Sequence, residues 1–222
     1  MRVLQYGDRA VLVELGTTEE AVAWARGLGG LLDLHGAADL VEQVVPAARS
    51  VLVVARDGVP LADLGRLVAD VRPGRGATAA DGEDRDDGEV VEVPTVYDGE
   101  DLDTVASLTG LDVAGVVAAH TGRTWQVGFA GFAPGFGYLL GGDERLHVPR
   151  RDEPRTRVPA GSVGLAGPYS GVYPTASPGG WQLIGRTELV LWDVDRDPPA
   201  LFRPGVRVRF VDVGGHPGAG DG

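Results

Sequence analysis

The sequence predicts an α+β protein in which an N-terminal ferredoxin-like α/β domain is followed by a second, mostly β domain. Three observations lead to this fold class. Segments near the N-terminus follow the order strand, helix, strand, strand, helix, which is the order of a ferredoxin-like sandwich if a further strand closes it. A stretch without apolar periodicity then interrupts the chain at residues 73–88. Beyond it, short apolar runs separated by turn residues continue to Val213, as in a small barrel or sandwich.

The first domain is predicted from its apolar periodicity and its helix-capping residues. Residues 10–15 are apolar enough for a strand, and Thr17 fits a helix N-cap because Glu20 follows three residues later. The helix that starts there is expected to run to about Leu32. The other predicted elements of this domain, which covers residues 1–72, are strands at 40–45 and 50–55 and a helix at 60–71 that opens with Pro60.

The rest of the chain is predicted to contain a linker, a β-rich domain and a tail. Glycine, alanine and acidic residues fill the stretch 73–88, which we expect to be a flexible acidic linker. The second domain then covers residues 89–213, and we expect the polar residues 214–222 to form a disordered tail. The first predicted elements of the second domain are a strand at 90–97 and helices at 101–108 and 112–121, each begun by a capping aspartate.

Composition excludes several classes of protein. The 222 residues include no cysteine, which removes disulfides, thiolate nucleophiles and cysteine-based metal sites. All 20 basic residues are arginine, so no lysine can carry biotin, form a Schiff base or bind phosphate. A net charge of −12 argues against nucleic acid as a partner. The chain shows no membrane-length apolar run, signal peptide or metal-ligand spacing, so we expect a cytoplasmic protein with no membrane partner and no bound metal of its own.

Residues 128–187 differ from the rest of the chain, and we expect the function to reside there. These 60 residues contain 13 glycines, 7 prolines and half of the chain's 14 aromatic residues. Such a composition fixes successive turns instead of filling a repetitive core. The region around this block is close to neutral while the remainder of the chain is acidic, so the block is suited to accept an anion.

Arginine and histidine side chains are the candidate catalytic groups. Arg150, Arg155 and Arg157 lie in a segment stiffened by prolines at five-residue intervals, which favours the capture of a carboxylate or phosphate. Surface ion pairs with neighbouring acids are the alternative role for these arginines. His120, at the end of a predicted helix, is a candidate general acid or base, and its alternative role is that of a structural histidine at a helix C-terminus.

Candidate binding residues follow from two turns of the block. Trp181 comes directly after two glycines, which predicts the wall of a ligand site with Gln182 and Arg186 as polar contacts. The alternative is a barrel-closing turn with Trp181 in the core. Ser162 is expected either to contact substrate or phosphate through its hydroxyl group or to serve a structural turn.

Three phrases of the block carry a family resemblance: GFAPGFGYL, VPRRDEPRTRVPAGSVG and YPTASPGGWQLIGRT. With the opening YGDRAVLVEL, they make the chain resemble the carboxyltransferase-domain family, subdomains C and D, which comprises the B subunit of 5-oxoprolinase, a sporulation-kinase inhibitor and allophanate hydrolase subunit 1. The resemblance implies that the second domain is a cyclophilin-like β-barrel. It also implies ligand-facing roles at the motif positions, namely Phe132, Pro134, Arg150, Arg155, Arg157, Ser162, Tyr173, Trp181, Gln182 and Arg186.

The function implied by the resemblance is that of one component of a heteromeric enzyme, inactive alone. The B subunit of an ATP-dependent 5-oxoprolinase would act with the C subunit, its direct partner, and with the A subunit to open 5-oxoproline to glutamate, using ATP with Mg at the level of the complex. One alternative is a regulatory protein that inhibits a sensor histidine kinase. The other is an allophanate hydrolase or urea carboxyltransferase component, which would need a biotin carrier on a different chain because this one has no lysine.

Overall fold

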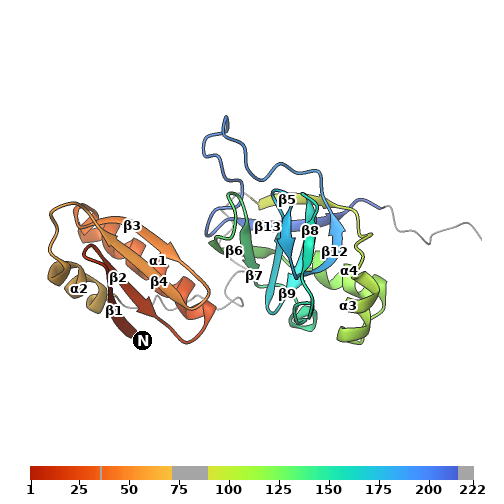
Figure 1. Cartoon of the computed structure of the whole chain (residues 1–222), viewed down its shortest axis with the longest axis horizontal. Coiled ribbons are helices and arrows are strands. Elements are labelled where there is room, and N and C mark those ends of the chain that lie inside the picture. Colours follow the sequence, from red (N-terminus) through yellow and green to blue (C-terminus); the bar gives the residue numbers. More distant parts are fainter. Residues whose placement is uncertain (36, 72–89, 215–222) are drawn as a thin grey trace, which may run out of the picture. The chain divides into compact units, whose positions relative to one another are not determined.

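The computed structural model describes residues 1–35, 37–71 and 90–214. Figure 1 shows its two compact units, Met1–Asp86 and Asp87–Gly222, which are described separately. The linker predicted at residues 73–88 and nearly all of the predicted tail lie outside the described residues.

The first unit contains a four-stranded antiparallel sheet in the order β1-β2-β4-β3. The strands are β1 Arg2–Tyr6, β2 Ala10–Glu14, β3 Val41–Pro46 and β4 Ser50–Ala55, and the helices are α1 Thr18–His35, the 3-10 helix η1 Ala37–Asp39 and α2 Leu61–Asp70. The predicted order from β2 to α2 is therefore present. The edge next to β2 is occupied by β1, which comes from the N-terminus of the chain, and not by a strand that follows α2. A ferredoxin-like sheet would have placed its last strand at this edge.

Local signals and strand alternation explain the core of this unit. The amide of Glu20 donates to Thr17 Oγ1 at 3.2 Å, so the predicted cap of α1 is present. Successive strand residues point to opposite faces of a sheet, and on one face the paired Val13 and Val51 have no exposed surface. They belong to one buried cluster with Trp24 of α1. Burial on one face of the sheet is thus what holds the helices to it.

The second unit is built on a seven-stranded sheet that nearly closes into a barrel. Its order is β12-β9-β10-β7-β6-β13-β5, with only β13 and β5 running parallel. The strands are β5 Val90–Thr95, β6 Trp125–Ala130, β7 Gly137–Leu140, β9 Ser162–Ala166, β10 Tyr169–Val172, β12 Gln182–Arg186 and β13 Arg207–Asp212. The two edges meet where Val96 and Arg186 exchange backbone hydrogen bonds of 2.9 Å each. This pairing confirms the predicted β-rich character and joins the first strand of the unit to the glycine-rich block.

Two short helices and a separate two-stranded ribbon complete the second unit (Figure 1). They are α3 Leu102–Thr109, α4 Val113–Thr121, the 3-10 helix η3 Glu144–Leu146, and the ribbon formed by β8 Arg155–Val158 and β11 Ser177–Gly179. Apolar side chains of α3 and α4 are buried in the main cluster of the barrel. In the described ranges no single helix is long and apolar enough to cross a membrane, and α3 and α4 meet that test only as a pair bent by 88°.

Candidate functional site

Seven aromatic side chains of the second unit are linked by ring contacts beside Val158 of the β8–β11 ribbon. They are Phe129, Phe132, Phe136, Tyr138, Tyr169, Tyr173 and Trp181, and we call them the aromatic cluster. Phe136 is central, with its ring centroid 5.1 Å from that of Tyr138 and 5.4 Å from that of Trp181. These are the same seven aromatics that the composition of residues 128–187 singled out. The block is therefore one physical unit, with edge-to-face ring contacts as its main packing mode.

Glycines of the block allow the rings to approach the backbone. A Cβ at Gly171 would lie 3.0 Å from Cζ of Phe136 and 3.1 Å from Cζ3 of Trp181, closer than side chains normally pack. A Cβ at Gly179 would meet the hydroxyl oxygen of Tyr173. The glycine density of the sequence thus serves close ring packing as well as turns.

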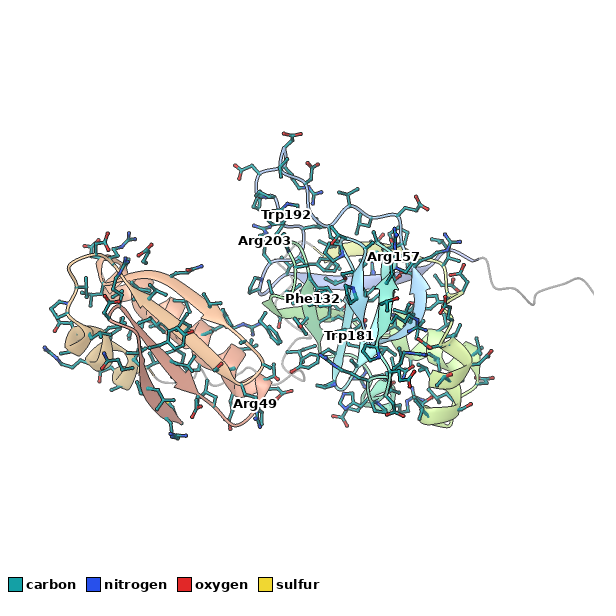
Figure 2. All side chains as sticks on the ribbon, viewed as in Figure 1. Arg49, Phe132, Arg157, Trp181, Trp192 and Arg203 are labelled. Carbon is teal, nitrogen blue, oxygen red and sulfur yellow. The ribbon has the colours of Figure 1, made fainter. Side chains whose placement is uncertain are left out.

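Phe132 is the exposed member of the aromatic cluster. Its side chain is 60% exposed, and its ring makes edge contacts with Phe136 at 5.4 Å and Tyr173 at 6.2 Å between centroids. Its φ of +71° lies in the left-handed region, which a residue with a bulky side chain rarely adopts. Strained, exposed residues of this kind concentrate at binding sites. Pro134, in the same loop, is also exposed, so Phe132 and Pro134 could both contact a ligand (Figure 2 labels Phe132 and Trp181).

Arg150 places an unpaired positive charge beside this cluster. Its side chain is exposed, and within the part of the chain that the structure describes no hydrogen bond or ion pair engages its guanidinium group. Burial raises the pKa of Tyr138 and of Tyr173, and the nearby charge of Arg150 opposes the rise at both phenols. A guanidinium group next to aromatic rings can bind an anionic group of a ligand whose apolar part lies on the rings.

Arg155 has a different environment from Arg150. Its Nη2 lies 2.9 Å from both carboxylate oxygens of Asp101, which is 2% exposed, and it also contacts Glu100 at 3.1 Å. Asp101 further accepts hydrogen bonds from Arg151 at 2.7 Å and from the amide of Leu183 at 2.7 Å. Burial alone would raise the pKa of Asp101, but the hydrogen bonds from Arg155 and Leu183 and the two positive charges outweigh it, so the pKa is lowered. Arg155 therefore ties the arginine segment to the start of α3, a geometry that favours a positioning role over the catalytic one predicted.

Arg157 and Arg186 lie apart from this ion-pair network. Arg157 is exposed on β8, and among the described residues no ion pair or hydrogen bond engages its side chain. Arg186 is paired with Asp98 at 3.0 Å beside the seam of the barrel. A shallow, mostly apolar cavity of about 310 Å³ lies at this seam, lined by Pro94, Val96, Arg186, Thr187, Glu188, Leu189 and Val213. The structure thus places Arg186 at this cavity, and it makes none of the ring contacts of the aromatic cluster.

Trp181 and Gln182, predicted to line one site, diverge because consecutive residues of an extended chain point to opposite faces. Trp181 is buried in the aromatic cluster, so it forms the floor of that region more than an exposed wall. Gln182 pairs with Leu165, whose side chain belongs to the barrel core, and its Nε2 donates to the carbonyl of Pro149 at 3.2 Å. Its Oε1 is buried and has no hydrogen-bond partner among the described residues. Gln182 thus supports the backbone immediately before Arg150.

Ser162 and Tyr173 are joined through the backbone. Ser162 is 5% exposed at the start of β9, and its carbonyl accepts from the amide of Tyr173 at 2.9 Å. Tyr173 is 1% exposed, and its ring belongs to the aromatic cluster. Both residues are well placed to shape the site, but their burial leaves little surface for a ligand.

His120 lies in the barrel interior with no exposed surface and not among the arginines. Its Nδ1 is 2.7 Å from the Tyr97 hydroxyl, and its Nε2 is 2.8 Å from Ser170 Oγ. Ser170 in turn donates to the carbonyl of Gly164 at 3.4 Å, which leaves it free to accept from Nε2–H while Tyr97 donates to Nδ1. Burial lowers the pKa of His120 to about 3, so the ring is neutral at pH 7. This geometry argues against the role of general acid or base, because the ring is out of reach of a ligand. His120 is instead a structural histidine in the last turn of α4, as the alternative expected, but it acts through hydrogen bonds of the neutral ring and not through a charge.

The buried imidazole predicts acid sensitivity of the fold. An unfolded histidine titrates near pH 6.5 and the native one near 3, so the unfolded state binds the extra proton between these values. This contribution is fully present above about pH 6.5 and is lost as the pH falls towards 3, with a slope approaching about 1.4 kcal/mol per pH unit. Urea unfolding of the wild type and of His120→Gln from pH 7 to 4 measures it. Equal acid slopes in the two proteins would contradict the prediction.

Comparison with known proteins defines the family. A family model described as "Carboxyltransferase domain, subdomain C and D" matches residues 1–202. The chain belongs to this family. Its relatives within the family include the B subunit of 5-oxoprolinase from Escherichia coli O157:H7, which is 56% identical over 124 residues, a match that covers 54% of this chain and 57% of the relative. The match therefore spans little more than half the length of this curated relative.

Solved structures extend the likeness to nearly the whole chain. The protein TTHA0988 superimposes with a TM-score of 0.74 at 36% identity, over 93% of this chain and 40% of the other. The urea carboxylase of Kluyveromyces lactis superimposes with a TM-score of 0.68 at 21% identity, over 95% of this chain and 21% of the other, and at that identity it supports the fold alone. The nearly closed barrel is thus the fold of the carboxyltransferase-domain family.

Several residues of the site were not among those predicted from the sequence, among them Tyr138, Tyr169 and Asp101. Tyr138 and Tyr169 are partly exposed members of the aromatic cluster, and their position in the aromatic-rich block was a signal for them. The sequence predicts Asp101 only as a helix cap, yet its side chain makes no hydrogen bond to its own helix. Because its partners are about 50 and 80 positions away in sequence, no local pattern could identify it.

Proposed function

We propose that this chain is the B subunit of a heteromeric, ATP-dependent 5-oxoprolinase that opens 5-oxoproline to glutamate together with the A and C subunits. The observation that carries the proposal is the 56% identity to the B subunit of a 5-oxoprolinase over 124 residues. In fold terms, the barrel would be of the cyclophilin-like type, and the first unit would be a ferredoxin-like sheet in which β1 takes the place of the last strand. Because the reaction uses ATP, we expect the complex to be cytoplasmic.

The aromatic cluster with Arg150 supplies the binding surface that this substrate needs. 5-Oxoproline combines a small ring with a carboxylate, and it would place the ring on Phe132 and Tyr138 and its anionic group at Arg150. Phosphorylation of the lactam oxygen by ATP, with release of ADP, would activate the carbonyl carbon for attack by water. The C–N bond of the ring would then break to leave the amino group and an acyl phosphate, and a second water would hydrolyse the acyl phosphate to glutamate and phosphate. The resulting negative charge needs cations, and in a chain without lysine Arg150 and Arg157 carry guanidinium groups open to that role.

Magnesium would enter this reaction with the nucleotide. Within the described part of the chain, no group of three histidine, cysteine, aspartate or glutamate side chains is placed to hold a metal ion. Mg²⁺ in such reactions is usually held by phosphate oxygens, waters and one or two carboxylates. We propose that ATP and Mg²⁺ act at the level of the assembled complex, and that this chain is inactive alone.

Reconstitution tests the proposal. Mixing the purified chain with its A and C subunits, 5-oxoproline, ATP and Mg²⁺ should release glutamate and ADP, and omitting this chain should abolish both products. Chromatography of the amino acids and a coupled ADP assay measure them. Turnover of a different lactam or of a urea derivative alone would refute the substrate, and full activity without this chain would refute the role.

The regulatory alternative is favoured by one observation, the exposure of Phe132 and Pro134 on a loop that could insert into a protein groove. A sensor histidine kinase would be the partner in that case. Capture of such a kinase by the purified chain, without binding of the A or the C subunit, would favour regulation. A urea carboxyltransferase role has weaker support, namely the fold and a match of 39% identity to the urea amidolyase of Saccharomyces cerevisiae that covers only 27% of this chain.

A further inference from the structure

Three large apolar side chains are exposed at alternate positions in the segment that follows β12. Val190, Trp192 and Val194 are 59%, 40% and 75% exposed, whereas Leu191 is 2% exposed and belongs to the barrel core. Val190 and Trp192 flank the buried Leu191, and Val194 lies in the turn that begins at Asp193, whose carbonyl accepts from the amide of Arg196 at 3.2 Å. We call residues 188–200 the arm. In Figure 1 it is the blue chain that leaves the barrel after β12, and Figure 2 labels Trp192 on it.

The arm is held in a defined shape by its own hydrogen bonds. They run from the amide of Leu201 to the carbonyl of Leu191 (2.9 Å), from the amide of Asp193 to the carbonyl of Pro199 (3.1 Å) and from Nη2 of Arg196 to the carbonyl of Val190 (2.9 Å). Single exposed apolar side chains are common on protein surfaces, but three within five residues of an ordered segment are typical of a binding surface. Because the segment is already ordered, the arm itself would lose little conformational entropy when a partner binds.

Charge on the arm decides which kind of partner fits. The arm carries four carboxylates, from Glu188, Asp193, Asp195 and Asp197, against the single guanidinium of Arg196. Two arms from two copies of this chain would bring like charges together, and each copy has a net charge of −12. A partner with arginine or lysine around an apolar pocket would be attracted instead. The charge pattern therefore favours a different protein over a second copy.

The arm also adjoins the candidate site. Gly135 lies so close to it that a Cβ at that position would be 2.9 Å from Cβ of Trp192. Gly135 is three residues beyond Phe132, the exposed and strained member of the aromatic cluster. A protein seated on the arm would consequently lie next to the loop that carries Phe132, where it could contribute the missing side of the site.

We propose that the arm is the docking surface for another component of the enzyme, which inserts apolar side chains around Trp192 and places basic side chains against the acidic residues of the arm. This inference rests on the proposed function only for the identity of the partner as the A or the C subunit. The term "subunit" in the relatives' name supports the existence of such chains. Trp192 is the expected centre of the contact, since tryptophan dominates the binding energy of many protein interfaces.

Affinity measurements with purified components test the docking surface. The full chain is titrated with the C subunit and, separately, with the A subunit, using biolayer interferometry without substrate. We expect Trp192→Ala to weaken the tighter of these complexes by about 30-fold or more and Val194→Asp by at least about tenfold. The matched control is Leu108→Asp on α3, where the side chain is 51% exposed and away from the arm, and it should change the affinity less than about twofold.

Several outcomes would overturn the inference, and thermal melts confirm that each variant is folded. The inference fails if neither component binds the wild type, or if both arm variants bind as tightly as the wild type. It also fails if sedimentation shows a dimer of the chain alone that Trp192→Ala dissociates, because the arm would then bind a second copy. If the arm variants lose binding and the complete mixture with the wild-type chain forms no glutamate, the docking surface is supported and the proposed enzyme is refuted. Glutamate formation by the complete mixture, together with unchanged binding of the arm variants, would support the proposed enzyme and overturn the docking surface.

Discussion

Asp101→Asn should lower the free energy of unfolding at pH 7 by about 3 kcal/mol, because it removes the charge that compensates Arg155 and Arg151. Breaking a buried ion pair by removing one partner commonly costs about 3–5 kcal/mol. We place this variant at the low end since Arg155 keeps its contact with Glu100. The asparagine oxygen can still accept from the amide of Leu183, so the loss is mainly one of charge.

Urea unfolding of the wild type and the variant measures this difference. The matched control is Asp98→Asn, which breaks the more exposed pair with Arg186 and should cost less than about 1 kcal/mol. The pKa of Asp101 is lowered in the folded state, so its contribution is present above the ordinary aspartate pKa and is lost as the pH falls through the folded value. The gap between wild type and Asp101→Asn should therefore narrow in acid. A cost at pH 7 no larger than that of the control would contradict the role of Asp101.

Elements that depend on local patterns were predictable from the sequence. The cap at Thr17 and the aspartate that begins α4 are present, with Asp112 accepting from the amide of Gly115 at 2.8 Å. The glycine-rich and aromatic block was also recognised by composition alone, and its seven aromatics are linked by ring contacts into one cluster. These features can be recognised in the sequence because the residues that interact lie within a few positions of one another or within one stretch of distinct composition.

What the sequence could not supply is the pairing between distant segments. Asp101 is a residue type that often caps a helix, and only the fold brings it to Arg155 and Leu183. His120 has the residue type of a general base, and only the barrel shows that Tyr97 and Ser170 enclose it. Residue type suggests a chemistry, but burial and partners decide whether that chemistry is accessible.

One error in the predicted site could have been avoided from strand geometry. Trp181 and Gln182 are consecutive residues at the start of an extended segment, so period-two alternation separates their side chains before any tertiary structure is known. The arginines show the limit of that argument. Arg155 and Arg157 are two residues apart on β8, but the register against β11 is irregular there, since Arg155 is opposite Gly179 and Val158 is opposite Ser177. Regular alternation therefore does not place the two side chains on one side: Arg155 is bound by Asp101, and Arg157 is exposed.

Arg150→Ala should lower kcat/KM of the reconstituted enzyme for 5-oxoproline by about 100-fold while leaving the free energy of unfolding within about 0.5 kcal/mol of the wild type. We expect activity to fall without a loss of stability because of the environment of Arg150. Its side chain is exposed, it lacks a partner among the described residues, and its charge acts on Tyr138 and Tyr173. Removing it therefore leaves no buried charge uncompensated, in contrast to Asp101→Asn. Arg150→Lys should recover only part of the activity, because an ammonium group cannot bind a carboxylate through two parallel hydrogen bonds.

Arg145→Ala is the matched control for Arg150→Ala, since Arg145 is an exposed arginine five residues away that is paired with Asp143 at 2.6 Å. Its loss should change kcat/KM less than about twofold and stability by less than about 1 kcal/mol. Steady-state kinetics and urea unfolding on the same preparations give both quantities. Wild-type kcat/KM in Arg150→Ala would remove Arg150 from the site, and a large loss of stability would mean that its exposed guanidinium has a structural partner. If Arg157→Ala alone were inactive, the anion would instead be bound at β8, because that strand carries the other exposed arginine of the block without an ion pair among the described residues.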